Sequence, residues 1–265
     1  MLDLYHAPIS TCSQKVRMAL CEKELVWNDK IVNLQKGEQF APDYVTLNPN
    51  AVVPTLVDDG VVIIESTLIN EYVDDKYTDH PLKPDRAEDR YAMRLLTKKT
   101  DDKGQPAIAV LTYAIGARPM LLAQPKDQVM SMFAKIPLDA KRKARISVYE
   151  KGVHAPEVAD AVNEFVALFK EMDQLLIGRQ WLAGDRFSLA DIAAMPYALR
   201  IDHLGLTPMI TEAGLNNLAD WYGRVRARPS FVQAVEKYTP PPVVEAFQAE
   251  GAKVWPDVAT MLAAA

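Results

Sequence analysis

A short apolar run is followed at once by a helix start that is rich in hydroxyl and thiol groups. Residues 2–5 (Leu-Asp-Leu-Tyr) are long enough for one strand, and from Val16 onward apolar residues recur at the spacing of a buried helical face. Between them lies the segment 10–13, Ser-Thr-Cys-Ser. The first turn of a helix has N–H groups without partners and a partial positive charge, so it suits an anion. The stretch therefore indicates either a helix cap at Ser10 or Ser13, or a site that stabilises a thiolate.

The next seventy residues carry the signals of three more strands and one more helix. Two apolar runs on either side of an Asp-Gly turn are the strongest short-range indication of a hairpin. In chain order the signals are a strand at 26–32, a strand at 52–57, the turn at 58–60, a strand at 61–64, and a helix that starts at Glu65-Ser66 and ends before His80-Pro81. The order strand, helix, strand, hairpin, helix predicts an α/β unit of the form βαβ–ββα.

From about residue 86 to the end the pattern is helical, without a convincing strand. One long helix is expected to begin near Tyr91 and to reach about Leu111, with a kink or break at Pro106. Residues 162–176 have the spacing of a strongly amphipathic helix. We therefore predict that the second part of the chain is all-helical.

These patterns divide the chain into three parts. We predict an α/β domain at residues 1–80, an all-helical domain at 86–240, and a C-terminal tail at 241–265 that has one weak helix and packs on the helical domain. Three consecutive prolines, 240–242, mark the end of the helical body because proline cannot continue a preceding helix.

Composition excludes several classes of function. The formal net charge of −5 and a pI near 5.5 argue against a nucleic-acid or anionic-membrane surface. No apolar run is long enough to span a membrane, and the N-terminus lacks a basic-then-apolar leader, so we expect a cytoplasmic protein. The two cysteines, Cys12 and Cys21, fall in one predicted helix and belong to no metal-spaced cluster, so neither a disulfide nor a metal is expected.

Two further segments carry groups that suit a small peptide. Pro54 cannot donate to a sheet, so it either starts a strand with an ordinary trans bond or, if cis, turns the backbone of Val53 outward to pair with an extended peptide. Glu65 offers a carboxylate to an ammonium group, and Ser66 either caps a helix or binds a carboxylate there. Together with the helix start at Ser10, these segments describe a site for a peptide that has a thiol and a free amino-acid end.

Three motifs in this order resemble those of the glutathione S-transferase superfamily. Residues 10–20 are similar to the Ser-Ser-Cys-Ser-x-Arg-Val-Arg-Ile-Ala-Leu signature of its Zeta class. Residues 48–54 with Glu65-Ser66 are similar to its glutathione motif, and residues 184–191, with Ser188 three positions before Asp191, resemble its capping motif. The resemblance implies a thioredoxin-like N-terminal domain followed by an all-α domain, glutathione as co-substrate, no metal, and a homodimer.

Residue by residue, the resemblance implies a set of site residues. Ser10 matches the catalytic serine of the Zeta class, and Ser13 matches a serine of bacterial lignin β-etherases, so the hydroxyl that activates the thiol is Ser10 or, second, Ser13. No general base is then needed, and no role falls to His6 or the other histidines. The expected glutathione-binding residues are Ser10, Cys12, Gln39, Val53, Pro54, Glu65 and Ser66. Two positions depart from the family's pattern: Ala51 replaces a common glycine, and Val52 a common polar residue.

The segment 113–157 is longer than an ordinary connection between helices, and its aromatic and methionine content suits a hydrophobic ligand. With the basic run 141–145 it resembles the β-etherase and fungal-type relatives. We expect Tyr113, Met120 and Tyr149 to bind the electrophile, and the reaction to be detoxifying conjugation, or ether cleavage, of bulky aromatic compounds. The alternatives are a Zeta-like glutathione-dependent isomerase and a non-catalytic binding or scaffold protein with the same fold.

Overall fold

The computed structural model describes residues 1–263, so the last two residues of the predicted tail lie outside the described part. The chain forms two compact units. The first, here called the sheet unit, contains residues 1–98, 178–196 and 221–240. The second, the helical unit, contains residues 99–177, 197–220 and the chain from 241 onward.

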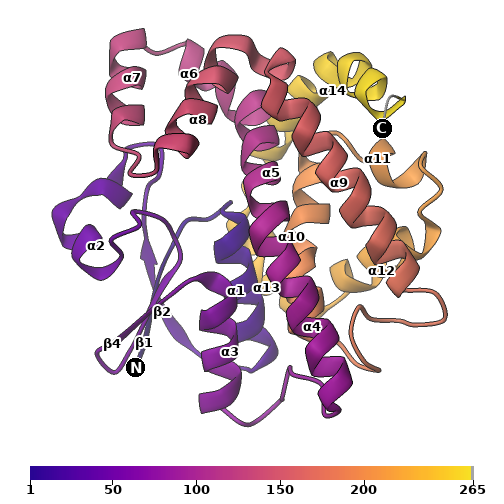
Figure 1. Ribbon diagram of the computed structural model, residues 1–265. Coiled ribbons are helices and arrows are strands. Elements are labelled where there is room, and N and C mark those ends of the chain that lie inside the picture. Colours follow the sequence, from indigo (N-terminus) through magenta and orange to yellow (C-terminus); the bar gives the residue numbers. More distant parts are fainter. Residues whose placement is uncertain (264–265) are drawn as a thin grey trace. The chain divides into compact units, whose positions relative to one another are not determined.

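A four-stranded mixed sheet is the centre of the sheet unit (Figure 1). Its strands are β1 (Leu2–His6), β2 (Trp27–Ile31), β3 (Thr55–Asp58) and β4 (Val61–Ile64), in the order β2-β1-β3-β4. β2 is parallel to β1, whereas β3 pairs antiparallel with both β1 and β4. This arrangement and the helices between the strands confirm the predicted βαβ–ββα unit. The predicted run 52–57 was wrong at its start, because β3 begins only after Pro54, which lacks the N–H that a sheet ladder needs.

Helices cover both faces of this sheet. The helices α1 (Thr11–Glu22) and α3 (Ser66–Lys76) lie side by side on one face, where Leu4, Leu20 and Val73 belong to one buried apolar cluster. The short helix α2 (Pro42–Leu47) contributes Tyr44 to a second cluster, which also contains Val53. Alternate residues of β1 serve the two clusters, as the two-residue period of a strand requires.

One helical path runs from residue 87 to residue 122. Its segments are α4 (Ala87–Lys99), the π-helical η2 (Thr100–Gly104), α5 (Gln105–Leu111), the π-helical η3 (Thr112–Ala117) and α6 (Arg118–Leu122). The predicted break at Pro106 takes the form of the π segment directly before it. The proline ring crowds the carbonyl four residues earlier, that of Asp102, which lies inside this segment.

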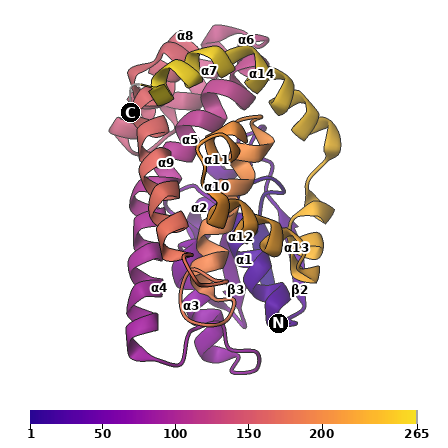
Figure 2. The same cartoon turned by 90° about the vertical axis from the view of Figure 1, so that its right-hand side faces the viewer.

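The remaining helices complete both units. They are η1 (Glu38–Phe40), α7 (Lys126–Ala134), α8 (Asp139–Lys151), η4 (Gly152–His154), α9 (Pro156–Leu175), α10 (Leu189–His203), α11 (Pro208–Thr211), α12 (Asn216–Arg226), α13 (Pro229–Ala234), η5 (Glu236–Tyr238) and α14 (Pro241–Ala263). Within the helical unit α9 packs along α5, and Figures 1 and 2 show the two side by side. Within the region of the expected tail, α14 is one helix of 23 residues that packs on α9 and η3.

Two further observations complete the fold. After Ile64, none of residues 65–263 lies in a strand, as the sequence predicted for its second part. None of the helices within residues 1–263 combines the length and the apolar composition of a membrane-crossing segment.

Candidate active site

Strand register brings the predicted site segments to one end of the sheet. Tyr5 pairs with Thr55, Thr55 pairs with Ile64, and His6 pairs with Ile31. The chain leaves β1, β2 and β4 at this end, and it enters β3 there. The connecting segments at this end carry Ser10, Gln39, Val53-Pro54 and Glu65-Ser66. The sheet therefore collects residues from three connections, those that follow β1, β2 and β4.

Ser10 caps α1 at the end of a tight turn. Its N–H donates to the carbonyl of Ala7 at 3.2 Å, which closes a turn that has Pro8 at its second position, where the ring pre-sets φ. Ser10 has an extended conformation (φ −67°, ψ 125°), and its Oγ accepts a hydrogen bond from the N–H of Ser13 at 3.3 Å. The hydroxyl is half-buried at the first turn of the helix. It therefore both caps the helix and lies where the helix favours an anion.

The two other polar groups of this turn are placed differently. The side chain of Ser13 is fully buried, and its Oγ accepts a hydrogen bond from the N–H of Ala7 at 3.3 Å. Cys12 is half-buried at the second residue of α1 and is not part of a disulfide. Of the two serines that the sequence left open, Ser13 is thus bound inside the protein, whereas Ser10 is partly accessible.

The segment before β3 is held by Tyr44 and Asn48, which leave the backbone of Val53 unused. The hydroxyl of Tyr44 donates to the carbonyl of Val52 at 2.6 Å, and the amide of Asn48 donates to the same carbonyl at 3.0 Å. The Val53–Pro54 bond is cis. Within residues 1–263, nothing is hydrogen-bonded to the N–H or the carbonyl of Val53. An extended peptide could pair with these two groups. The sequence analysis did not identify Tyr44 as a residue that supports the site. The available signal was a tyrosine located eleven residues before Thr55.

Two residues near this segment have backbone conformations that side chains disfavour. Glu65 has φ +68° and Ala51 has φ +51°. The value at Ala51 explains why glycine suits this position, since glycine adopts positive φ without a steric penalty. Glu65 is exposed, its carboxylate accepts a hydrogen bond from Asn50 at 3.2 Å, and Ser66 begins α3 directly after it. Positive φ at a non-glycine residue is typical of binding sites, where surrounding structure maintains it.

Gln39 lies in η1, in the segment that follows β2. Its side-chain oxygen is buried, and no donor among residues 1–263 reaches it. A buried acceptor without a partner is uncommon in proteins and suits a ligand that brings a donor.

Among residues 1–263, no group of three or more potential metal ligands lies close enough to hold an ion.

In the helical unit, Tyr113 and Tyr149 share one apolar cluster, but Met120 does not. Tyr149 is buried with its ring edge-on to Phe133 at 5.9 Å between centroids, and Tyr113 packs at the border of the cluster. The guanidinium of Arg145 lies over the ring of Tyr113, and burial lowers the pKa of Arg145 to about 10. Met120 lies outside the cluster and is 45% exposed.

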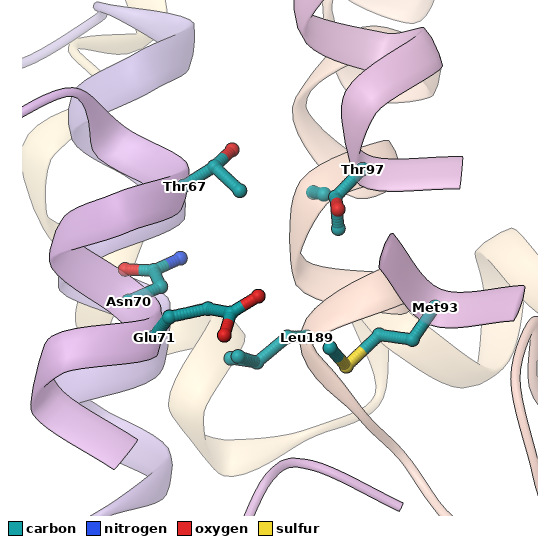
Figure 3. A pocket seen from close by; sticks show the side chains of 7 residues that line it. Thr67, Asn70, Glu71, Met93, Thr97 and Leu189 are labelled. Carbon is teal, nitrogen blue, oxygen red and sulfur yellow. The ribbon is translucent and has the colours of Figure 1, made fainter. Parts of the chain in front are cut away.

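The helical unit contains a cavity of about 250 Å³ beside these residues. Its apolar walls include residues of η3 and α14, and its polar lining comes from Arg118, Lys151, His154 and Glu250. In the sheet unit, a narrow hollow lies between α3 and α4 and is lined by Thr67, Asn70, Glu71, Met93, Thr97, Leu189 and Ala193 (Figure 3). None of the predicted site residues within 1–263 lines this hollow.

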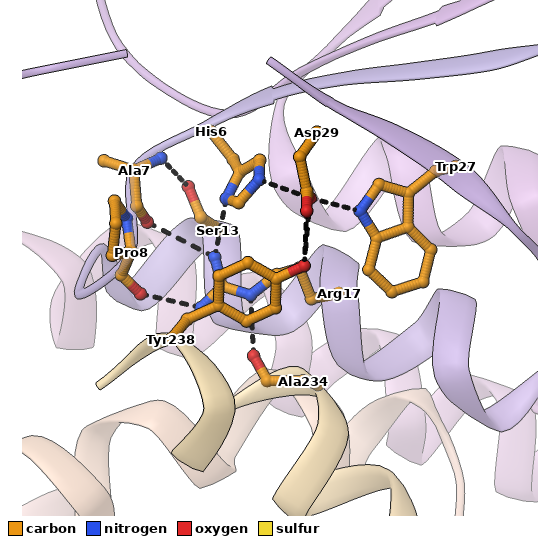
Figure 4. A network of polar contacts seen from close by, with 9 residues as sticks. All are labelled: His6, Ala7, Pro8, Ser13, Arg17, Trp27, Asp29, Ala234 and Tyr238. Carbon is orange, nitrogen blue, oxygen red and sulfur yellow. Dashed lines mark hydrogen bonds and ion pairs between the residues drawn. The ribbon is translucent and has the colours of Figure 1, made fainter. Parts of the chain in front are cut away.

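A network of polar groups, with His6 and Arg17 buried at its centre, contacts the Ala7–Pro8 turn (Figure 4). His6 is completely buried, with Nδ1 at 2.9 Å from Arg17 Nη1 and Nε2 at 2.9 Å from Asp29 Oδ1. Because a guanidinium can only donate, Nδ1 must accept and Nε2 must carry the proton. Burial, helped by the nearby charge of Arg17, lowers the pKa of His6 to about 4. His6 is therefore neutral at pH 7 and has a structural role.

Neutral His6 predicts a loss of stability in mild acid. Its folded pKa of about 4 lies below the ordinary value of 6.5, so the unfolded chain binds more protons between these values. From pH 7 to pH 4.5 the protein should lose about 2 kcal/mol of unfolding free energy through this residue. We expect the stability difference between wild type and His6→Gln, measured by urea denaturation, to shrink by this amount over the same range. His154→Gln, which changes an exposed histidine, is the control. A His6→Gln difference that does not change with pH would contradict the assignment.

Comparisons with known proteins agree with this geometry. Residues 9–76 match the family model described as "Glutathione S-transferase, N-terminal domain", and residues 129–229 match "Glutathione S-transferase, C-terminal domain". The tetrachloro-p-hydroquinone reductive dehalogenase of Sphingobium chlorophenolicum is 31% identical over 243 residues, which cover 88% of this chain and 95% of the relative. Glutathione S-transferase Z2 of Arabidopsis thaliana is 30% identical over 244 residues, which cover 90% and 92% of the two chains.

A solved structure shows the same fold. The β-etherase LigF from Sphingobium sp. strain SYK-6 superposes with a TM-score of 0.81 at 24% identity, over 89% of this chain and 99% of that one. Both domain models and two nearly full-length relatives thus agree with the mixed sheet and the helical part described above. The chain belongs to the glutathione S-transferase superfamily.

Proposed function

We propose that this protein adds the glutathione thiolate to a hydrophobic, aromatic electrophile, by conjugation or by cleavage of an aryl ether. The observation that carries the proposal is the convergence of Ser10, Val53 and Glu65 at one end of the sheet. Glutathione would lie extended along the backbone of Val53, with its γ-glutamyl end at Glu65 and Ser66 and its glycyl end near Gln39. Its sulfur would then lie at the first turn of α1, beside Ser10 and Cys12.

The first turn of α1 has enough stabilising groups to ionise the thiol. Lowering a thiol pKa of about 8.5 by two units requires roughly 2.7 kcal/mol of thiolate stabilisation. One hydroxyl hydrogen bond to a charged group supplies about 1.5–3 kcal/mol, and a helix N-terminus adds about 0.3–1 kcal/mol. No general base is needed in this mechanism, which agrees with a neutral, buried His6.

The choice between Ser10 and Ser13 predicts different variant behaviour. Ser10→Ala should raise the pKa of the bound glutathione thiol by about 1–2 units, since one charge-assisted hydrogen bond is lost. The shift is measured from the ultraviolet absorbance of the thiolate at saturating glutathione and from the acidic limb of the rate profile. Ser13→Ala should lower stability and cause a smaller shift, because its hydroxyl binds Ala7 inside the protein. A larger shift for Ser13→Ala would reverse the assignment, and no shift in either would leave backbone N–H groups or Thr11 as the stabilising groups.

The electrophile is proposed to bind at the cluster that contains Tyr113 and Tyr149, and to contact Met120, which is exposed outside this cluster. The apolar cluster and the nearby cavity of about 250 Å³ support a hydrophobic aromatic substrate. Turnover of an aromatic halide and of a β-aryl ether with glutathione tests the proposal directly. A protein that gains no thermal stability from glutathione and turns over neither probe would instead be a binding or scaffold protein.

We also propose that the protein is a homodimer that associates through the sheet unit. Exposed apolar side chains lie on β4, α3 and α4 of this unit, with Leu68 60% exposed, Tyr91 68% and Leu95 50%. Where such side chains adjoin one another, they favour association with a second copy of the chain. Light scattering should give a dimer for wild type and a monomer for the double variant Leu68→Arg/Tyr91→Arg. The control, Val26→Arg, changes an apolar residue that is 89% exposed but lies before β2, and should remain dimeric. A wild-type monomer at micromolar concentration would refute the proposal.

We propose a cytoplasmic location, with which two cysteines that form no disulfide agree, and a role in detoxification follows from the proposed reaction. Cell fractionation tests the location, and recovery of the protein only from an oxidising compartment would contradict it.

A further inference from the structure

The guanidinium of Arg17 is completely buried, yet it is paired mainly with carbonyl groups (Figure 4). Its Nη2 donates to the carbonyl of Pro8 at 2.7 Å, and Nε donates to the carbonyl of Ala234 at 2.6 Å. Nη1 is shared between His6 at 2.9 Å and the carbonyl of Ala7 at 3.3 Å. In the part of the chain that the structure describes, no carboxylate contacts this guanidinium directly. Burying a charge without a direct counter-ion lowers the stability of the folded state. An apolar residue at this position would therefore give a more stable protein.

Two of the three carbonyls that Arg17 binds belong to the turn that carries Ser10. The carbonyl of Ala7 accepts from Arg17 and also from the N–H of Ser10 at 3.2 Å. The N–H of Ala7 is in turn bound by Ser13 Oγ at 3.3 Å. Arg17 and Ser13 therefore fix the peptide groups on both sides of Ala7, and the position of Ser10 depends on them.

The other contacts of Arg17 come from the segment 229–240, which contains α13 and η5. The ring of Tyr238 covers the guanidinium, with 4.4 Å between Cζ and the ring centroid. The Tyr238 hydroxyl donates to the carboxylate of Asp29 at 2.8 Å, and this carboxylate also accepts from His6 and from the indole of Trp27. Asp29 thus balances the charge of Arg17 through His6 and Tyr238. Burial lowers the pKa of Arg17 to about 10, so the guanidinium remains charged at neutral pH.

We propose that Arg17 is a positioning residue for the reaction: held from behind by Tyr238, it fixes the Ala7–Pro8 turn and so places the Ser10 hydroxyl against the glutathione sulfur. The inference rests on the proposed function, because Arg17 acts through Ser10 and touches neither glutathione nor the electrophile. By this proposal the segment 229–240 takes part in thiol activation, although it lies more than 200 positions from Ser10 in the sequence.

The test measures the pKa of the bound glutathione thiol, from thiolate absorbance at saturating glutathione, in a double-mutant cycle. Arg17→Met should raise this pKa by about half a unit to one unit, equivalent to a three- to tenfold loss of thiolate at low pH. kcat at pH 6.5 should fall by a similar factor, whereas KM for glutathione should change less than about twofold. In the Ser10→Ala background, Arg17→Met should cause no further shift, since coupled residues are not additive.

Three further variants separate positioning from charge and from stability. Arg17→Lys keeps the charge but not the multiple donors, so it should behave like Arg17→Met. Tyr238→Phe keeps the ring and loses the bond to Asp29, and it should give a smaller shift in a folded protein. The matched control is Arg228→Gln, which breaks the paired bonds of 2.7 Å to Glu22. Arg228, which directly precedes this segment, binds Glu22 at the opposite end of α1, so this variant should lose stability without a thiol shift.

The outcomes distinguish this inference from the proposed function. If Ser10→Ala raises the thiol pKa but Arg17→Met and Tyr238→Phe do not, positioning by Arg17 is refuted and the proposed function stands. An equal shift from Arg17→Met with and without Ser10, or full rescue by Arg17→Lys, also refutes it, because the charge alone would then act on the sulfur. If Ser10→Ala leaves the thiol pKa unchanged, positioning by Arg17 is refuted together with the role of Ser10, whereas the proposed function is refuted only if neither aromatic probe is turned over with glutathione.

Discussion

Replacing Asp191 with alanine should lower the free energy of unfolding by about 3–5 kcal/mol, through loss of a buried acceptor that four donors share. The carboxylate accepts from the N–H of Leu182 at 3.0 Å and from Trp221 Nε1 at 2.8 Å. It also accepts from the N–H and the hydroxyl of Ser188, at 2.9 and 3.1 Å. Burial raises the pKa of Asp191 to about 6, so at pH 7 the group is ionised and can only accept. Alanine would leave all four buried donors without a partner.

Urea denaturation at pH 7 measures this loss, and two comparisons show its origin. Asp191→Asn keeps the shape but places N–H groups opposite some of the donors, so it should also be strongly destabilising. Asp139 at the start of α8 has exposed ion-pair partners, Arg142 and Lys143, and Asp139→Ala should leave stability nearly unchanged. A loss below about 1 kcal/mol for Asp191→Ala would mean that water satisfies the donors.

The capping box around Asp191 was visible in the sequence because its signal is local. Ser188 and Asp191 stand three positions apart, and the structure confirms α10 starting directly after Ser188. The hairpin at Asp58-Asp59-Gly60 was equally readable, since positive φ at residues 59 and 60 suits an Asp-Gly turn. Local backbone preferences and hydrophobic spacing therefore predicted the four strands and the longer helices, but not the shorter helices such as α2, α7 and α13.

Contacts between residues that are far apart in the sequence could not be predicted from such local patterns. Arg17 was part of a recognised motif, yet the contacts that define its surroundings come from Ala234 and Tyr238. Tyr44 binds a carbonyl eight positions away on the far side of a turn, which no periodicity reveals. The positive φ of Glu65 was likewise hidden, because the residue type disfavours it and surrounding structure maintains it. Sequence patterns could thus predict which segments form the site, but not the side chains that hold those segments in place.

Adding a single methyl group at Gly251, in the helical unit, should lower the free energy of unfolding about as much as Asp191→Ala does. This residue lies inside α14, where a Cβ would come within 1.7 Å of the carbonyl oxygen of Leu204. Backbone atoms cannot move aside as a flexible side chain can, so Gly251→Ala must displace α14 or the chain at Leu204. We expect a loss of about 3 kcal/mol or more in unfolding free energy, at the upper end for overpacking.

The control for Gly251→Ala is a glycine-to-alanine substitution at a helical position where no other atoms lie near the added Cβ. Gly223 lies exposed in α12, and a Cβ there meets nothing within 4 Å. Gly223→Ala should therefore stabilise the protein by about 0.5–1 kcal/mol, because alanine loses less backbone entropy than glycine in a helix. Opposite signs at the two positions, measured by thermal and urea unfolding, would show that close backbone contact requires glycine at position 251. Stabilisation at both positions would instead mean that α14 does not pack this closely on Leu204, and that the C-terminal helix is attached more loosely than its contacts with α9 and η3 indicate.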